Sequence, residues 1–199
     1  MPPPQATSRR RLSKADRRRQ LLDVAWDIAR RDGVDALTLG RLALDAGVSR
    51  PIAYEHFDTR HGLLVALYSE IADRQYAQAQ QVLEQAVTDL PALATRVGQA
   101  FMHCYTTTGP EAFAIAASLK GDRAMEEAQD QLIERYVSAY AKAFEPVTSL
   151  DGPALRLRFA AVVAAGDELS KKMLAGEIDE TTAADTLASL IVAWLPAAT

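Results

Sequence analysis

Apolar residues recur at helical spacing in segment after segment of this chain, and short breaks containing glycine or proline separate the segments. This period of about 3.6 residues predicts amphipathic helices. The sequence shows no strand-like alternation over four or more residues and no repeat of fixed length. The predicted helices span about 13–31, 39–46, 50–57, 60–89, 91–106, 110–120, 122–145, 154–175 and 179–195. We therefore expect an all-α fold with about nine helices.

The composition is that of an ordinary globular protein. The chain has 199 residues, of which 49% are hydrophobic and 24% are charged, so it is long enough to bury a core without disulfides or metals. Its single cysteine, Cys104, excludes an intramolecular disulfide and a zinc ribbon. No run of 18 uncharged apolar residues is present, so we expect no membrane span. Because no signal peptide is visible, we expect a cytoplasmic protein.

Charge is distributed unevenly along the sequence. Residues 1–62 carry a net charge of +4, whereas residues 63–199 carry −8. A basic head on an acidic body indicates a polyanionic partner for the head. Residues 1–12, with three prolines and Arg9 to Arg11, read as a flexible basic arm that contacts phosphates transiently, or else as a solvated tail.

Residues 38–57 have the spacing of a helix-turn-helix. Ala43 supplies the small residue where two helices touch, and Gly47 supplies a turn residue that tolerates a positive φ angle. Leu42, Ala46 and Val48 form the apolar seam. Ser49 is placed to cap the second helix with its hydroxyl, and the first residues of that helix would enter the major groove of DNA. The alternative is a plain α-hairpin.

Three sequence stretches carry a family resemblance. They read L-x-x-A-W-x-I-A-R-R-x-G, T-L-x-x-L-A-x-x-A-G-V-S and A-Y-E-H-F-D-T-R-x-x-L-L. Over about residues 15–75 the chain resembles the N-terminal domain of the tetracycline-repressor (TetR) family of bacterial regulators. The resemblance implies a DNA-binding domain at 13–60 and a helical ligand-binding and dimerisation domain at 61–199. It further implies a homodimer that binds double-stranded DNA at a palindromic operator and is released by a small, largely apolar effector.

The same resemblance implies which residues of the head contact DNA. Arg50 would donate to guanine, and Pro51 would lie against a thymine methyl group. Phosphate or sugar contacts fall to the remaining polar positions, and Phe57 packs inside. The full implied set is Thr38, Ser49, Arg50, Pro51, Ile52, Tyr54, His56 and Arg60. Two departures from the family pattern are Ala53, where a larger aliphatic residue is usual, and Gly40, which lacks a base-reading side chain. We therefore expect few direct base contacts and a contribution from DNA shape.

Two apolar stripes near the end of the chain are candidates for a dimer interface. They lie at helical spacing on two successive predicted helices, and two such pairs would form a four-helix interface. The proposed interface residues are Leu155, Phe159, Val162, Gly166, Leu169, Leu187, Leu190 and Trp194. The same spacing fits a second interpretation equally well, in which these stripes pack inside their own subunit.

By analogy with the family, the region at about 91–145 would enclose the effector. Aromatic, sulfur and histidine side chains suit an apolar site with few polar groups. The candidates are Phe101, His103, Cys104, Phe113, Tyr136 and Tyr140. His103 is the polar candidate among them. The alternative is that these residues are ordinary core.

An enzyme is the competing class, and the sequence argues against it. Two of the three histidines, His56 and His61, lie in the head, which makes a three-histidine zinc site improbable. His103 and Cys104 are adjacent, so on a helix they point about 100° apart and do not form a nucleophile–base pair. Phosphate-binding glycine motifs are absent. We expect no cofactor, no metal and no catalysis. A DNA-binding module without ligand control is the remaining alternative.

Overall fold

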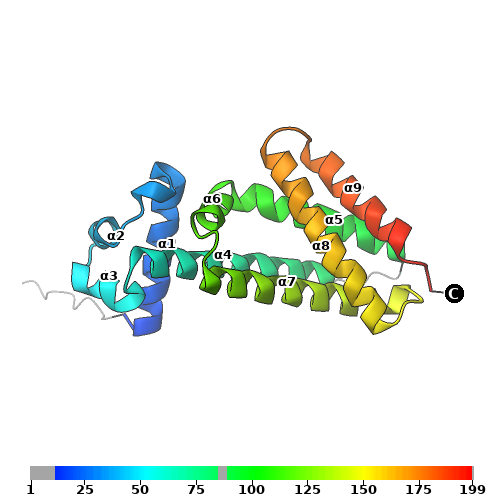
Figure 1. Ribbon diagram of the computed structural model, residues 1–199, viewed down its shortest axis with the longest axis horizontal. Helices are drawn as coiled ribbons and strands as arrows, with labels where there is room; N and C mark the ends of the chain where they lie inside the picture. The colour runs from blue at the N-terminus through cyan, green and yellow to red at the C-terminus, as the bar shows by residue number, and fades with distance from the viewer. Residues whose placement is uncertain (1–11, 85–88, 199) are drawn as a thin grey trace, which may run out of the picture. The chain divides into compact units, whose positions relative to one another are not determined.

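The computed structural model describes residues 12–84 and 89–198 (Figure 1). Within these ranges the chain forms nine α-helices and no named strand, which confirms the all-α prediction. The helices are α1 (Lys14–Asp32), α2 (Leu39–Asp45), α3 (Arg50–Phe57), α4 (Arg60–Leu83), α5 (Leu90–Thr108), α6 (Glu111–Ser118), α7 (Arg123–Phe144), α8 (Gly152–Leu174) and α9 (Glu180–Trp194). Short 3₁₀ turns follow α1 and α7, at Val34–Ala36 and Glu145–Val147. The expected basic arm lies almost wholly outside the described residues.

Side-chain caps explain where most of these helices begin. A free N–H group in the first turn needs an acceptor, and a serine, threonine or aspartate just before the helix provides it. Six helices use this device, and in each the cap accepts from the backbone N–H three residues on. The capping residues are Ser13, Thr38, Asp89, Asp122, Asp151 and Asp179. Local sequence therefore fixed these starts to within a residue or two.

The predicted end of α4 was wrong. The sequence places it at about Asp89, before Pro91, but α4 is described only to Leu83 and Asp89 instead caps α5. The cap is a hydrogen bond of 2.8 Å from the Ala92 N–H to the Asp89 carboxylate. Pro91 therefore lies in the first turn of α5, where its missing N–H costs nothing.

The chain divides into two compact units, one ending at Leu67 and the other beginning at Tyr68. The first unit packs α1, α2, α3 and the start of α4 around a small core. Leu21, Ile28, Leu37, Leu42 and Leu63 are completely buried there. The division falls inside the continuous helix α4, whereas the sequence-based boundary lies at residues 60 and 61. No break in composition marks the interior of a helix, so the sequence carries no signal at this point.

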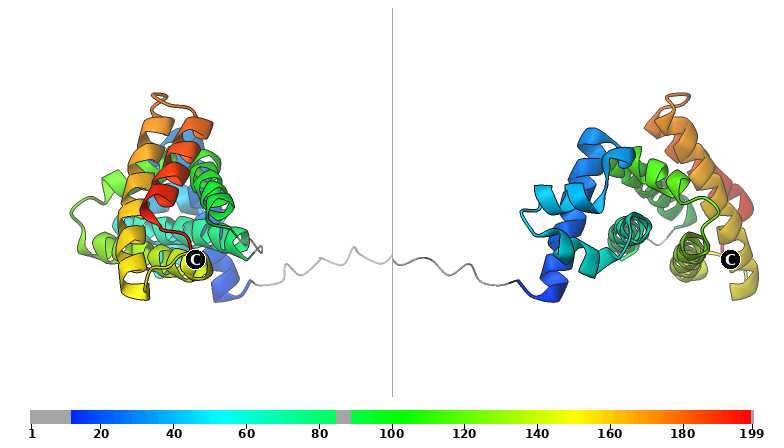
Figure 2. Two further views of the ribbon diagram at one scale, coloured as in Figure 1. Left: turned by 90° about the vertical axis from the view of Figure 1, so that its right-hand side faces the viewer. Right: turned by 60° about the vertical axis from the view of Figure 1, so that its left-hand side comes forward.

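The second unit is a helical bundle in which α5 packs against α9, and α8 packs against α5, α7 and α9 (Figures 1 and 2). Phe144 and Phe159 meet at its centre, with ring centroids 4.9 Å apart and both side chains fully buried. An isolated antiparallel bridge joins Thr148 to Ala197. The hydroxyl of Thr148 also donates to the carbonyl of Pro196 at 2.7 Å.

The predicted dimer seam is largely wrong. Its stripes face the core of their own subunit, which is the alternative interpretation of the same spacing. Leu155, Phe159, Val162, Gly166 and Leu187 are buried, while Leu169 and Leu190 are half-buried against the same core. Trp194 is the exception, with 43% of its surface exposed. Helical periodicity identifies an apolar face but not the partner that covers it.

Candidate DNA-binding surface and ligand pocket

The turn between α2 and α3 closes as the sequence predicts. Gly47 has a φ angle of +64°, a value that glycine adopts without strain. Two backbone hydrogen bonds close the turn, from Gly47 N–H to the Leu44 carbonyl at 3.1 Å and from Val48 N–H to the Ala43 carbonyl at 3.0 Å. This pair of bonds is the Schellman motif. Ala43 is buried, as a contact between the two helices requires.

Helix α3 presents an exposed face at its beginning. Ser49, Arg50, Pro51 and Tyr54 are exposed, and Tyr54 retains 53% of its accessible surface. Ile52 is half-buried. The expected Ser49 hydroxyl cap does not form. The N–H of Ile52, three residues on, donates instead to the backbone carbonyl of Ser49 at 3.0 Å.

The buried side of α3 is held by α1. Ala53 is fully buried, which leaves no room for the larger aliphatic residue that the family pattern has there. Arg18 of α1 donates to the His56 carbonyl at 2.7 Å, and its guanidinium lies 4.9 Å from the centre of the Phe57 ring. Partial burial lowers the pKa of His56, and neighbouring cations such as Arg18 lower it further.

Arg60 lies at the start of α4, where its guanidinium ties two backbone carbonyls. Its Nε donates to the Leu37 carbonyl at 2.8 Å, and its Nη2 donates to the Val34 carbonyl at 2.9 Å. These carbonyls belong to the 3₁₀ turn that precedes α2. Arg60 therefore fixes the connection between α1 and α2, a contribution to structure that the sequence did not predict.

A network of four charges joins the end of α1 to α2. Arg31 and Arg41 each bond both Asp32 and Asp45, with nitrogen–oxygen distances between 2.8 and 3.0 Å. The hydrogen bond from Arg31 lowers the pKa of Asp32, and the bond from Arg41 lowers the pKa of Asp45. Two of the basic residues of the head are thus neutralised by their own neighbours.

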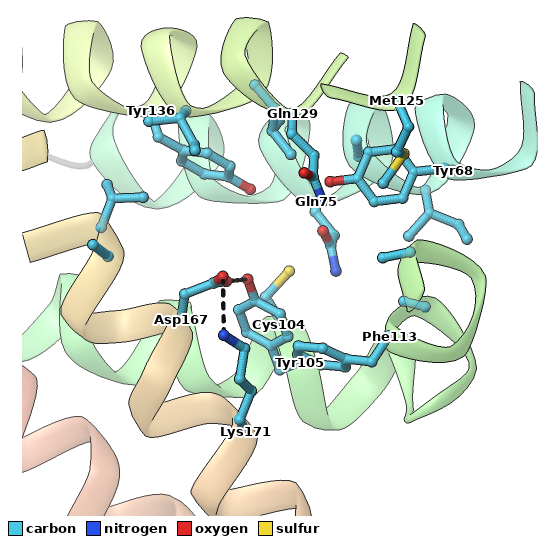
Figure 3. Close-up of a pocket in the computed structure, with 18 of the residues that line it drawn as sticks. Tyr68, Gln75, Cys104, Tyr105, Phe113, Met125, Gln129, Tyr136, Asp167 and Lys171 are labelled. Carbon is cyan, nitrogen blue, oxygen red and sulfur yellow. Dashed lines mark hydrogen bonds and ion pairs between the residues drawn. The ribbon is translucent and has the colours of Figure 1, made fainter. Parts of the chain in front are cut away.

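The second unit contains a pocket of about 760 Å³ (Figure 3). Residues of α4, α5, α6, α7 and α8 line it, and all of them belong to this unit. Its volume lies in the range of small-molecule sites. Aromatic rings pair along its walls. Tyr105 stacks on Phe113 with ring centroids 5.2 Å apart, and Tyr136 stacks on Tyr140 at 5.8 Å.

Polar groups are set into this aromatic wall. The hydroxyl of Tyr105 donates to Asp167 Oδ1 at 2.6 Å (Figure 3). Gln129 and Tyr68 line the pocket from α7 and α4. The amide of Gln75 donates to the Thr108 hydroxyl at 3.1 Å. The pocket therefore offers fixed hydrogen-bonding positions on an apolar surface.

Five of the six residues proposed from the sequence line this pocket. They are Phe101, Cys104, Phe113, Tyr136 and Tyr140. His103 does not. Its side chain is 69% exposed, and its Nδ1 lies 3.3 Å from the Glu180 carboxylate. Because Cys104 faces inward, its neighbour on the helix is turned toward solvent.

The pocket holds polar residues that the sequence did not single out. Gln75, Gln129 and Asp167 line it, from α4, α7 and α8. Each is a polar residue on an amphipathic helix, where the ordinary interpretation is a solvent-facing position. The sequence signal that could have identified Asp167 was its helical spacing on α8. Ala160, Ala164, Asp167 and Lys171 form one stripe of α8, distinct from the stripe that fills the core.

Burial keeps the thiol and the phenols of the pocket protonated. It raises the pKa of the Cys104 thiol to about 11, and it raises the pKa values of Tyr136 and Tyr140 as well. Burial also raises the pKa of Tyr105, reinforced by the negative charge of Asp167. The phenols remain hydrogen-bond donors at neutral pH, and the thiol is a poor nucleophile.

Residues 12–84 and 89–198 contain no group of three histidine, cysteine, aspartate or glutamate side chains placed to hold a metal ion. Nor does any helix in these ranges combine the length and hydropathy of a membrane span.

The exposed start of α3, the Schellman turn and the buried side chains of Leu42, Ala43 and Ala53 define a helix-turn-helix, an architecture of DNA-binding proteins. Residues 21–67 match the family model described as bacterial regulatory proteins, tetR family. This match lies within the unit that holds the helix-turn-helix, and over these residues the chain is similar to that family of regulators.

One curated relative and many solved structures extend the comparison. The HTH-type nicotine-responsive transcriptional repressor HdnoR of Paenarthrobacter nicotinovorans is 32% identical over 91 residues, which cover 46% of this chain and 46% of HdnoR. The chain thus matches just under half the length of this relative. A TetR transcription regulator from Haloarcula marismortui has a TM-score of 0.74 at 18% identity, covering 91% of this chain and 99% of that one. A tetR-family regulator from Streptomyces coelicolor has a TM-score of 0.70 at 19% identity, covering 92% and 80%. At these identities the structures support the fold.

Proposed function

We propose that this protein is a cytoplasmic repressor that binds a palindromic operator as a homodimer and is released by a small molecule. The observation that carries the proposal is the pairing of an exposed recognition helix in one unit with an aromatic pocket in the other. A regulator controlled by a ligand needs both parts, and α4 contributes residues to both units.

DNA contact is assigned to the exposed start of α3. Arg50 would donate to a guanine in the major groove, and Pro51 would touch a thymine methyl group. Ser49, whose hydroxyl does not cap the helix, would donate to a phosphate together with Tyr54. Thr38 and His56 would add contacts to the backbone of DNA, and Ile52 would border the groove. Arg60 supports this surface chiefly through its two bonds to backbone carbonyls.

A helix-turn-helix reads a short half-site, so a two-fold dimer is expected to double the contact. Most of the interface residues that the sequence predicted are buried, and we assign the interface instead to the outer face of α8 and α9, which retains Trp194. Leu157 is 75% exposed on α8, while Val192 and Trp194 are 39% and 43% exposed on α9. Covering these three apolar side chains would remove surface that is costly to leave in water.

The pocket is the proposed effector site. Its size and aromatic lining suit an organic molecule. The name of HdnoR states that this relative responds to nicotine, which supports a small organic effector for the present chain. Binding would favour a form of the protein that does not bind DNA, and by linkage DNA would weaken effector binding equally.

Selection of bound duplexes from a random DNA pool, at near-physiological salt, tests the proposal. We expect enrichment of an inverted repeat whose half-sites lie about one helical turn apart. The recovered duplex then serves to screen small molecules for release. Folded protein that enriches no sequence would contradict operator binding. Enrichment of a single half-site would contradict the dimer. Failure of every pocket ligand to release the duplex would favour a DNA-binding module without ligand control.

A further inference from the structure

We propose that the pocket recognises a ligand with a protonated amine, and that Asp167 accepts this amine. The inference deepens the proposed function and rests on it, because it concerns the same effector site. It starts from the charged groups that line the pocket, which are Lys120, Glu126, Asp167 and Lys171.

Asp167 is anchored from within the protein. Tyr105, a largely buried side chain, donates its hydroxyl to Oδ1 of Asp167 at 2.6 Å. This bond holds the carboxylate at the pocket wall, where Figure 3 shows it facing the open space. Lys120, Glu126 and Lys171 are exposed, whereas Asp167 is partly buried. Asp167 is thus a negative group that a largely buried side chain holds at the pocket wall.

The neighbouring lysine neutralises this charge incompletely. Lys171 Nζ lies 3.9 Å from Asp167 Oδ2 and 3.6 Å from Glu168 Oε2. Both distances exceed that of a hydrogen bond between charged groups. One cation is shared by two carboxylates, so the trio retains a net negative charge. A ligand ammonium group can bond Asp167 at a shorter distance than Lys171 does.

The aromatic walls favour a cation for a separate reason. Tyr105, Phe113 and Tyr136 present rings to the pocket (Figure 3). An ammonium group near a tyrosine or phenylalanine face is attracted by the negative face of the ring. An anionic ligand gains no such contact. It would also lie near Asp167, and the hydroxyl of Tyr105 is already donated to that carboxylate.

Three ligands with one skeleton test the inference, namely 4-phenylbutylamine, 4-phenylbutan-1-ol and 4-phenylbutanoate. Their dissociation constants are measured by calorimetry on the full chain without DNA. We expect the amine to bind about tenfold more tightly than the alcohol, and the carboxylate to bind most weakly, because a charge-assisted bond to Asp167 is available to the amine alone.

Two variants locate the effect. Asp167→Asn retains an acceptor for Tyr105 and removes the charge, so it should weaken amine binding about tenfold and leave the alcohol within about threefold. Asp130→Asn is the matched control, because it makes the same chemical change at an exposed residue of α7 that does not line the pocket. It should leave both affinities nearly unchanged. Alcohol binding by Asp167→Asn serves as the check that the pocket is intact.

Several outcomes would overturn the inference. Equal binding of amine and alcohol, preference for the carboxylate, or failure of all three ligands to bind would each do so. If the two variants weaken amine binding equally, the selectivity arises from the overall charge of the protein and not from Asp167. These measurements need no DNA. If the amine binds selectively but leaves the operator complex intact, the inference holds and ligand control is contradicted. If the protein binds its operator but shows no preference for the amine, the inference is contradicted and operator binding holds.

Discussion

The side chain of Arg50 lies beside Gly40, so that a methyl group built on Gly40 would be 3.8 Å from the Nε of Arg50. Gly40 is in the first turn of α2, and Arg50 is the first residue of α3. The missing side chain at position 40 leaves the guanidinium space to turn toward the groove. On the proposed function, we expect base contacts to come from α3 and not from position 40.

Arg50→Ala should weaken binding to the selected operator by about 1–3 kcal/mol and relax specificity at one position in each half-site. The loss follows from removal of a bidentate donor to guanine. Repeating the duplex selection with the variant measures both effects. Arg19→Ala, a change at an exposed residue of α1, is the control and should leave the preferred sequence unaltered. A loss that is uniform over all sequences would show that Arg50 touches only phosphate.

Arg60→Ala should lower the free energy of unfolding by about 1–2 kcal/mol, because the carbonyls of Val34 and Leu37 lose a charged donor that is itself partly exposed. Arg60→Lys keeps the charge but not the fork that reaches both carbonyls. Denaturant unfolding should therefore find the two variants similarly destabilised. Wild-type stability in Arg60→Lys would assign the residue to phosphate binding alone.

Leu157→Glu should give a folded monomer, because a carboxylate on the proposed interface must be desolvated when the dimer forms. Sedimentation velocity reports the oligomeric state, and circular dichroism reports the fold. Ser138→Glu, on the exposed side of α7, is the control and should remain dimeric. A dimer that survives Leu157→Glu would place the interface elsewhere.

Gly98→Ala should destabilise the second unit by about 1–3 kcal/mol. A methyl group on Gly98 would overlap the carbonyl oxygen of Ala184, so α5 and α9 must separate to admit it. The melting temperature measures the change. Gly152→Ala is the matched control, since nothing lies within 4 Å of a methyl group at that position. Equal stability of the two variants would refute the close approach of these helices.

Cys104 should react slowly with iodoacetamide at pH 7, because burial raises the pKa of its thiol to about 11. The reaction rate of the folded protein should rise with pH up to this pKa, whereas the reaction rate of the unfolded chain should level off near pH 9. The raised pKa also means that the folded state disfavours the thiolate. The buried neutral thiol therefore contributes fully to stability below pH 9, and this contribution is lost as the pH rises toward 11. A half-maximal rate near pH 8.5 in the folded protein would contradict this prediction.

The helix-turn-helix could be predicted because its signals are local. The cap at Thr38, the positive φ of Gly47 and the small residue Ala43 each act within a few residues of the chain. Such features depend little on the rest of the fold. The prediction of a Ser49 hydroxyl cap was wrong, because the N–H of Ile52 bonds the backbone carbonyl of Ser49 instead.

The pocket and the dimer face could be predicted only in part, because they depend on which helix covers which stripe. Phe159 and Leu157 both belong to α8, yet one is fully buried and the other is 75% exposed. Periodicity fitted an interface and a core equally well, and the family resemblance favoured the interface. Asp167 was missed because a polar residue facing a pocket has the same spacing as one facing solvent.

The four-charge network of Arg31, Asp32, Arg41 and Asp45 complicates a common experiment on proteins of this kind. Counting phosphate contacts from the decline of DNA affinity with added salt assumes that the protein itself is indifferent to ions. Here the same ions also screen the bonds between α1 and α2. The apparent number of released counterions will therefore exceed the number of phosphates touched, unless the stability of the head is measured at each salt concentration and subtracted.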